Sequence, residues 1–143
     1  MNRYAELKVR QQEEFDKLPL GFAFSDEQFK EMMERWGLDP ERDSDKITRI
    51  PYGGFIQKKD LDLFNKTMER HSAELKAAIE ADKTGEGFVS EMFLYELDNH
   101  EYGYTGDTED TLDALGYTAG EVVGDPRLKR GIEKAVTEIH RRD

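Results

Sequence analysis

Apolar residues recur three and four positions apart along most of the chain, which is typical of helices that bury one face. The most regular run covers residues 60–81, where Leu61, Phe64, Met68 and Leu75 share one helical side. Helices are predicted over residues 3–17, 26–36, 60–81, 90–99 and 108–115, with a short one after residue 118 and a last one from residue 126.

Residues with helix-capping chemistry stand at the start of three of these segments. Ser25 is followed three positions later by Gln28, and Thr118 by Glu121, which is the spacing of a capping box. Asp125 directly precedes a proline, and proline is favoured as the first residue of a helix.

Residues 47–57 follow a different pattern. Two short β-rich runs flank Pro51 and the Gly53-Gly54 pair, which predicts a small hairpin. Pro51 restricts such a hairpin to the edge of a sheet. Together the elements predict a mainly α, compact single domain over residues 1–143, with six or seven helices and one β-hairpin.

The composition excludes several classes of protein. The 143 residues contain no cysteine, which excludes disulfides, thiolate metal sites and cysteine nucleophiles. No apolar run approaches the roughly 18 residues of a membrane span, and the first residues lack the apolar region of a signal peptide. We therefore expect a cytoplasmic protein with no membrane partner and no cofactor. The sequence leaves its oligomeric state open.

Negative charge is concentrated in the second half of the chain. The formal net charge of −11 argues against direct binding to nucleic acid. Residues 59–125 contain 17 acidic and 5 basic residues, and no Lys or Arg lies between Lys83 and Arg127. The bases Arg127, Lys129 and Arg130 are candidates to fold back onto some of these acids. The predicted partner-binding residues are Glu86, Glu91, Glu96, Asp98, Glu101, Tyr102, Tyr104, Asp107, Glu109, Asp110 and Asp113.

Residues 82–89 look like the beginning of an EF-hand calcium loop after a helix. Oxygen-bearing side chains occupy the first, third and fifth positions, and Gly87 the sixth. The bidentate acid of the twelfth position is missing, because Phe93 stands there and Glu91 comes two places early. A helix-to-helix turn is the favoured interpretation. The candidate metal ligands are Asp82, Thr84, Glu86, Glu91 and His100.

The histidines allow a functional and a structural interpretation. His100 stands close to Glu96 and Glu101, and imidazole and carboxylate both bind zinc. The spacing matches no established metal signature, so a role at the C-terminal carbonyls of its helix is favoured. His71 lies on the apolar stripe of the long helix and is interpreted as a packed histidine with one hydrogen bond.

Few motifs for catalysis are present. The chain has no Gly-x-Ser-x-Gly elbow, no Walker loop and no Rossmann glycine fingerprint. Paired carboxylates are too abundant in this sequence to be diagnostic. We therefore do not expect an enzyme.

Three runs of the sequence carry a family resemblance. Residues 22–29 (FAFSDEQF), 81–88 (ADKTGEGF) and 95–102 (YELDNHEY) resemble a family of small acidic proteins from bacterial genomes, phages and mobile elements, with no assigned activity. The resemblance covers most of the chain and implies a cytoplasmic protein. In charge and size, proteins of this kind resemble anti-restriction and anti-CRISPR inhibitors, which is an analogy of class alone.

The leading hypothesis is a non-enzymatic acidic binding protein. Its acids would mimic nucleic-acid phosphates and occupy the basic nucleic-acid-binding groove of a partner protein, such as a host defence nuclease. The interleaved tyrosines would supply the anchors of the interface. Two alternatives remain open at this point: a calcium- or metal-responsive module, and a housekeeping or oligomeric domain whose charge only keeps it soluble.

Overall fold

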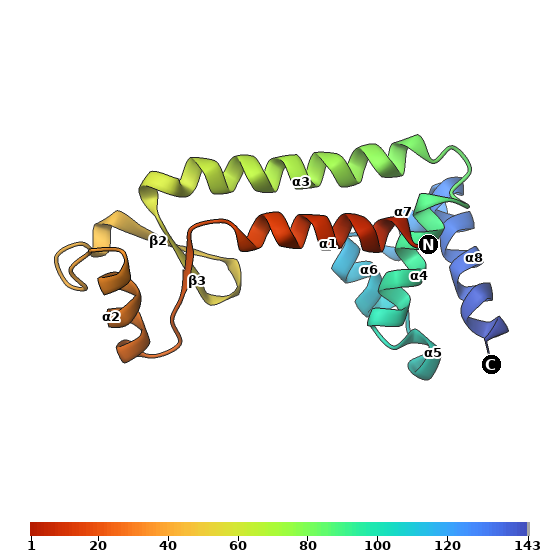
Figure 1. The fold of residues 1–143 in the computed structure, drawn as a ribbon. Coiled ribbons are helices and arrows are strands. Elements are labelled where there is room, and N and C mark those ends of the chain that lie inside the picture. The colour runs from red at the N-terminus through yellow and green to blue at the C-terminus, as the bar shows by residue number, and fades with distance from the viewer. Residues whose placement is uncertain (143) are drawn as a thin grey trace. The chain divides into compact units, whose positions relative to one another are not determined.

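The computed structural model describes residues 1–142, the side chain of Tyr52 excepted. Over this range the chain forms eight α-helices, three short 3₁₀ helices and one three-stranded antiparallel sheet (Figure 1). The mainly α class and the hairpin at residues 47–57 are confirmed. The elements are α1 (Arg3–Asp16), β1 (Leu20–Phe22), α2 (Asp26–Arg35), β2 (Ile47–Ile50), β3 (Gly54–Gln57), α3 (Leu61–Ala81), α4 (Phe88–Asn99), α5 (Tyr102–Thr105), α6 (Glu109–Leu115), α7 (Ala119–Gly124) and α8 (Pro126–Arg141).

Contacts along the chain divide it into two compact units. The helical unit combines residues 1–12 with residues 72–142, and the sheet unit comprises residues 13–71. The single domain expected over residues 1–143 stays a prediction. None of the helices over residues 1–142 has the length and apolar character needed to cross a membrane.

The central element of the helical unit is α4. Val89, Met92, Phe93 and Leu97 of this helix are fully buried and pack with apolar residues of α1, α6, α7 and α8. The long helix α8 approaches α4 closely at Gly131, where an added Cβ would lie 2.6 Å from Val89 Cγ1. The apolar face of α4 thus fixes the helices around it.

The helix α4 begins two residues earlier than the sequence predicts, at Phe88. Ser90, at which the predicted helix begins, is buried in the first turn, and its hydroxyl donates to the backbone carbonyl of Glu86 at 3.1 Å. The cap comes instead from outside the helix, because Asp82 Oδ2 accepts the N–H of Val89 at 2.9 Å.

Three other helix starts are capped as predicted. Ser25 Oγ accepts the N–H of Gln28 at 3.1 Å, and Thr118 and Glu121 form both bonds of a capping box. Asp125 Oδ1 accepts two backbone N–H groups from the first turn of α8. Each of these caps satisfies donors that the first turn of a helix leaves without partners.

The sheet unit contains the strands in the order β1-β3-β2. The predicted hairpin forms β2 and β3, and β1 adds to the other side of β3, with Gly21 opposite Phe55. The helix α2 packs on this sheet through Met32 and Met33, which are fully buried. Gly21 permits the close approach, since an added Cβ would lie 2.4 Å from Met32 Sδ.

Inside the sheet unit, Glu14 pairs with Arg70 and His71. Its hydrogen bond with Arg70, and then the 3.0 Å contact of its Oε2 with His71 Nε2, lower the pKa of Glu14 from 4.5 to about 2. Because this pKa is depressed in the folded protein, the charged carboxylate stabilises the fold above about pH 4.5, and the stabilisation is lost as the pH falls towards about 2.

We therefore expect a Glu14→Gln variant to be less stable than the wild type at about pH 6, and to lose this difference at about pH 2. Urea unfolding at both pH values measures the two free energies of unfolding. A difference that is the same at both pH values would contradict the pairing.

Candidate binding surface

Two short helices, α5 and α6, follow the end of α4 and contain most of residues 101–113. The first, α5, is anchored by Tyr102, whose ring stacks on that of His140 in α8 with the centroids 5.9 Å apart. Tyr104 lies two residues further and is 94% exposed. A large aromatic side chain in this position buries almost no area in the protein itself, so its area remains available to a partner.

The second short helix, α6, carries acids on its outer side. Thr111 and Leu112 are buried and fix the helix, and Thr111 Oγ1 donates to the backbone carbonyl of Glu96 at 3.3 Å. Glu109 and Asp110 are exposed and both lie within one turn of Asp113, which is exposed as well. Acids at this spacing are neighbours on a helix and repel each other by a few tenths of a kcal/mol.

We define the acidic surface as the exposed part of this segment. Its exposed acidic and aromatic side chains are those of Glu101, Tyr104, Asp107, Glu109, Asp110 and Asp113. Within residues 1–142, none of its five carboxylates forms an ion pair with a Lys or Arg. Six of the predicted partner-binding residues are therefore gathered in one short, solvent-exposed and uncompensated segment.

Glu101 has an unusual backbone for its residue type. Its φ of 59° and ψ of 33° place it in the left-handed region, directly after the C-cap His100 of α4. Gly37, Gly106 and Gly116 take a positive φ next to the ends of other helices of this chain. A non-glycine residue in this conformation costs roughly 1–2 kcal/mol. Glutamate at position 101 therefore makes the fold less stable than glycine would at the same position.

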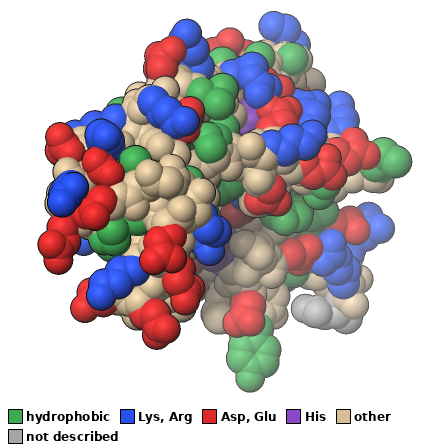
Figure 2. All heavy atoms as spheres, turned by 60° about the vertical axis from the view of Figure 1, so that its left-hand side comes forward, with side chains coloured by type: hydrophobic (Ala, Val, Ile, Leu, Met, Phe, Trp, Pro, Cys, Tyr) green, Lys and Arg blue, Asp and Glu red, His purple; other side chains and the backbone are tan. Residues whose placement is uncertain are grey.

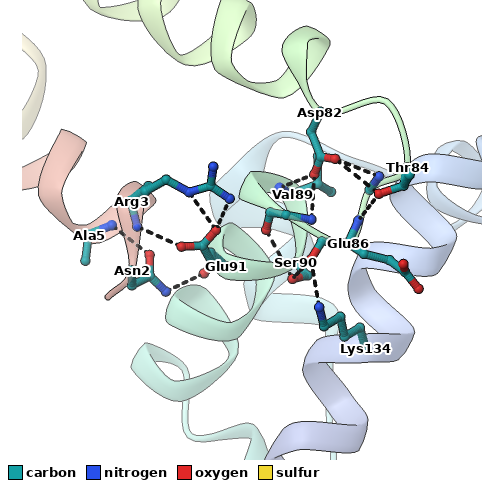
Figure 3. A network of polar contacts seen from close by, with 12 residues as sticks. Asn2, Arg3, Ala5, Asp82, Thr84, Glu86, Val89, Ser90, Glu91 and Lys134 are labelled. Atoms are coloured by element: carbon teal, nitrogen blue, oxygen red, sulfur yellow. Dashed lines mark hydrogen bonds and ion pairs between the residues drawn. The ribbon is translucent and has the colours of Figure 1, made fainter.

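Glu91, although predicted to bind a partner, is compensated within the protein. Both its oxygens accept hydrogen bonds from Arg3, one from the backbone N–H at 3.0 Å and one from Nε at 2.9 Å (Figure 3). Burial alone would raise the pKa of Glu91, but the hydrogen bonds from Arg3 outweigh it and lower the pKa. Glu91 thus fastens the start of α1 to α4.

Glu96 is buried, with 3% of its surface exposed, and cannot belong to an acidic face. Its Oε1 accepts a hydrogen bond from the Tyr4 hydroxyl at 2.9 Å and lies 3.6 Å from Lys8 Nζ, while its Oε2 lies 3.4 Å from His100 Nε2. Burial of Tyr4, and then the charge of Glu96, raise the pKa of the Tyr4 hydroxyl above its usual value. His100 is the C-cap of α4, in agreement with its predicted place at the helix carbonyls: its backbone N–H donates to the Glu96 carbonyl at 2.9 Å, while its ring contacts the Glu96 carboxylate.

Two other predicted acids lie beside bases of the last helix and the residue after it. Both oxygens of Asp98 accept hydrogen bonds from Arg142 Nη1, at 3.0 and 3.1 Å. Lys134 donates to the backbone carbonyl of Glu86 at 2.9 Å, and the Glu86 side chain is exposed. Asp98 is compensated by this ion pair, and Glu86 lies outside the acidic surface.

The bases at the start of α8 do not cover the acidic surface. Arg127 donates from Nη1 to the carbonyls of Ile79 and Asp82, at 3.0 and 2.9 Å. Its only ion pair among the described residues is with Asp125, at 4.0 Å. Of the acids in the stretch, Arg127 thus reaches only Asp125 among the described residues, and its guanidinium caps the end of α3.

The candidate calcium loop is organised by hydrogen bonds from its own backbone. Asp82 accepts N–H groups of Gly85 and Gly87 at 3.0 and 3.1 Å, in addition to the N–H that caps α4 (Figure 3). The twelfth position is the fully buried Phe93. In residues 1–142, the carboxylates and the imidazole among the predicted ligands do not bring three ligand atoms within reach of a single ion. The geometry accounts for the loop as a helix-to-helix turn.

One face of the molecule carries charges of both signs. On the face shown in Figure 2, Asp and Glu side chains are interspersed with Lys and Arg. The acidic surface differs from this pattern because its carboxylates stand in sequence without a base among them. Uncompensated like charges attract a partner of opposite sign.

A family model matches residues 3–138, which is nearly the whole chain; it is described as a family of unknown function, DUF7659. The chain belongs to the DUF7659 family. This membership agrees with the expected uncharacterised family, and it assigns no role to any residue of this DUF7659 protein. No curated protein and no solved structure matches the chain.

Proposed function

We propose that this protein is a non-enzymatic binding protein that docks its acidic surface into a basic, nucleic-acid-binding groove of a partner protein. The observation that carries the proposal is the set of five exposed carboxylates over residues 101–113 without an ion pair among the described residues. A groove that holds phosphates presents Arg and Lys side chains, which such a surface complements. Binding of this kind would exclude nucleic acid from the groove.

The neighbouring acids support the choice of this segment. Glu91 and Asp98 form ion pairs within the helical unit, and Glu96 is buried. The protein thus compensates the acids on and around α4, while those of the adjoining segment face solvent without a base. Tyr104 adds a nearly fully exposed ring, which gives the surface an apolar anchor.

A DNA- or RNA-binding nuclease of a host defence system is the partner class that we propose. Charge fixes the rate and the salt dependence of such an encounter, and an aromatic anchor adds affinity. The resemblance to small acidic inhibitors points to the same class by analogy alone.

Affinity capture with matched variants tests this function. The triple variant Glu109→Gln/Asp110→Asn/Asp113→Asn removes three charges from the acidic surface. The control Glu6→Gln/Glu80→Gln/Glu133→Gln removes three charges from other exposed positions of the helical unit. Immobilised proteins are incubated with lysate of the host and the captured proteins are quantified.

We expect the wild type and the control to capture a nucleic-acid-binding protein, and the triple variant to capture at least about tenfold less of it. Capture that falls equally in both variants would show that the net charge of the protein, and not the acidic surface, determines binding. That result would contradict the proposed surface. Capture of the same protein by all three would contradict the proposed surface.

A further inference from the structure

The strand β2 has one edge without a partner. In the order β1-β3-β2 it pairs only with β3, where Thr48 lies opposite Ile56 and Arg49 opposite Phe55. Within residues 1–142, no backbone hydrogen bond reaches the other edge of Thr48 or Arg49. An exposed strand edge presents N–H and C=O groups that another extended chain can satisfy.

A hollow of about 570 Å³ lies directly beside this strand, and three aromatic rings from different elements line it. They are Phe24 before α2, Phe29 in α2 and Phe55 in β3. Phe29 and Phe55 meet edge to face with their centroids 5.6 Å apart, whereas Phe24 is 76% exposed. The hollow thus has two fixed walls and one ring that a ligand could cover.

Residues of β2 itself form another wall of the hollow. Ile47, Thr48 and Arg49 line it, so the hollow adjoins the strand whose edge is free. The guanidinium of Arg49 stands over the Phe55 ring, 5.7 Å from its centroid, and the residue is exposed. Asp26 contributes one negative charge to the lining, at the first turn of α2, where the helix dipole offsets it.

We propose that this surface binds an extended peptide segment of a partner protein. The peptide would add a strand beside β2, insert one apolar side chain among Phe24, Phe29 and Phe55, and place an acidic side chain next to Arg49. An extended backbone supplies the donors and acceptors that the edge lacks, and its side chains alternate between the two faces of the sheet.

The sheet unit disfavours nucleic acid as the occupant. Residues 13–71 contain 14 acidic and 10 basic residues, whereas binding to phosphates requires a basic surface. The proposal rests on residues of the sheet unit alone. It is therefore independent of the acidic surface, and either can fail while the other stands.

A random seven-residue peptide library displayed on phage is the first probe, selected against the full chain. We expect enriched peptides with alternating apolar residues and at least one Asp or Glu. A synthetic peptide of the enriched sequence is then titrated into the isotopically labelled protein. Its largest amide shifts are expected at residues 47–50 and at Phe24.

Two variants test the roles of the hollow and of the charge. Phe24→Ala should weaken binding of the peptide about tenfold or more, because the variant lacks the exposed ring that the peptide would bury. Arg49→Glu should weaken binding of an acidic peptide up to about fivefold. The same variant should bind more tightly to a peptide in which Lys replaces the acid. Lys59→Glu is the matched control, since Lys59 is exposed and does not line the hollow.

Methylation of alternate backbone nitrogens of the peptide tests the strand pairing itself. One of the two alternating sets carries the N–H groups that face β2, so its methylation should abolish binding while the other set is tolerated. Failure to enrich any peptide, shifts that map away from β2, or binding unaffected by Phe24→Ala would each overturn the proposal. So would sedimentation showing that a second copy of the chain already occupies this edge.

Discussion

Replacing Gly85 with alanine is expected to lower the free energy of unfolding by about 3–5 kcal/mol. Gly85 has a φ of +87°, and an added Cβ would lie 2.0 Å from the backbone carbonyl oxygen of Arg127. A backbone carbonyl cannot relieve this clash by rotating away, whereas the end of a flexible side chain can. The substitution therefore forces the loop after α3 away from the start of α8, and Arg127 is the residue whose guanidinium caps α3.

Gly106→Ala is the matched control for this substitution. Gly106 also has a positive φ, of +71°, but nothing lies within 4 Å of an added Cβ. Only the backbone strain remains, so a loss of about 1–2 kcal/mol is expected. Urea unfolding of both variants measures the difference. Equal losses would mean that the close approach to Arg127 adds nothing to the stability lost by Gly85→Ala.

The second large effect is expected at the buried carboxylate of Glu96. Tyr4→Phe removes the hydroxyl that donates to Glu96 at 2.9 Å and keeps the edge-to-face contacts of the ring with Phe88 and Tyr95. A hydrogen bond to a charged group contributes about 1.5–3 kcal/mol, and burial prevents water from replacing it here. We expect a loss of that size in urea unfolding.

Lys8→Met provides the comparison. Lys8 Nζ lies 3.6 Å from Glu96, but 49% of its side chain is exposed, and exposed ion pairs contribute less than about 1 kcal/mol. Methionine keeps an unbranched apolar side chain at position 8 and removes the positive charge. A larger loss for Lys8→Met than for Tyr4→Phe would show that the ion pair, and not the tyrosine, holds the buried acid.

Local signals in the sequence predicted the elements whose ends they control. The Ser25 and Thr118 caps, and the Asp125-Pro126 pair, determine helix starts within a few residues of chain, and all three are observed. The observed start of α4 differs from the prediction because its cap, Asp82, stands six residues before Phe88. A cap at that distance has no recognised spacing in a sequence.

Elements and contacts that depend on distant parts of the chain were not predicted. The strand β1 has three residues and exists through its pairing with β3, while Pro19 and Gly21 alone indicate the end of a helix. Pairing of Glu91 with Arg3 joins residues 88 positions apart. Composition located the acidic stretch, but only the fold separates acids that are paired or buried from those of the acidic surface.

One further feature of the acidic surface could have been recognised from the sequence. Glu101 follows a helix at a position where glycine is favoured, and the chain places glycine next to the ends of α2, α5 and α6. A residue that departs from this preference is a candidate for a role beyond stability. Glu101 stands at the first position of the segment that we propose to bind the partner.

Displacement of duplex DNA from a defence nuclease tests the central claim most directly. A fluorescent duplex is bound to a purified RNA-guided nuclease, and its anisotropy is followed as the protein is added at several salt concentrations. We expect displacement that weakens steeply as salt rises, and that is at least about tenfold weaker for Glu109→Gln/Asp110→Asn/Asp113→Asn than for the control triple variant. No displacement at low salt, or equal displacement by both triple variants, would contradict the account.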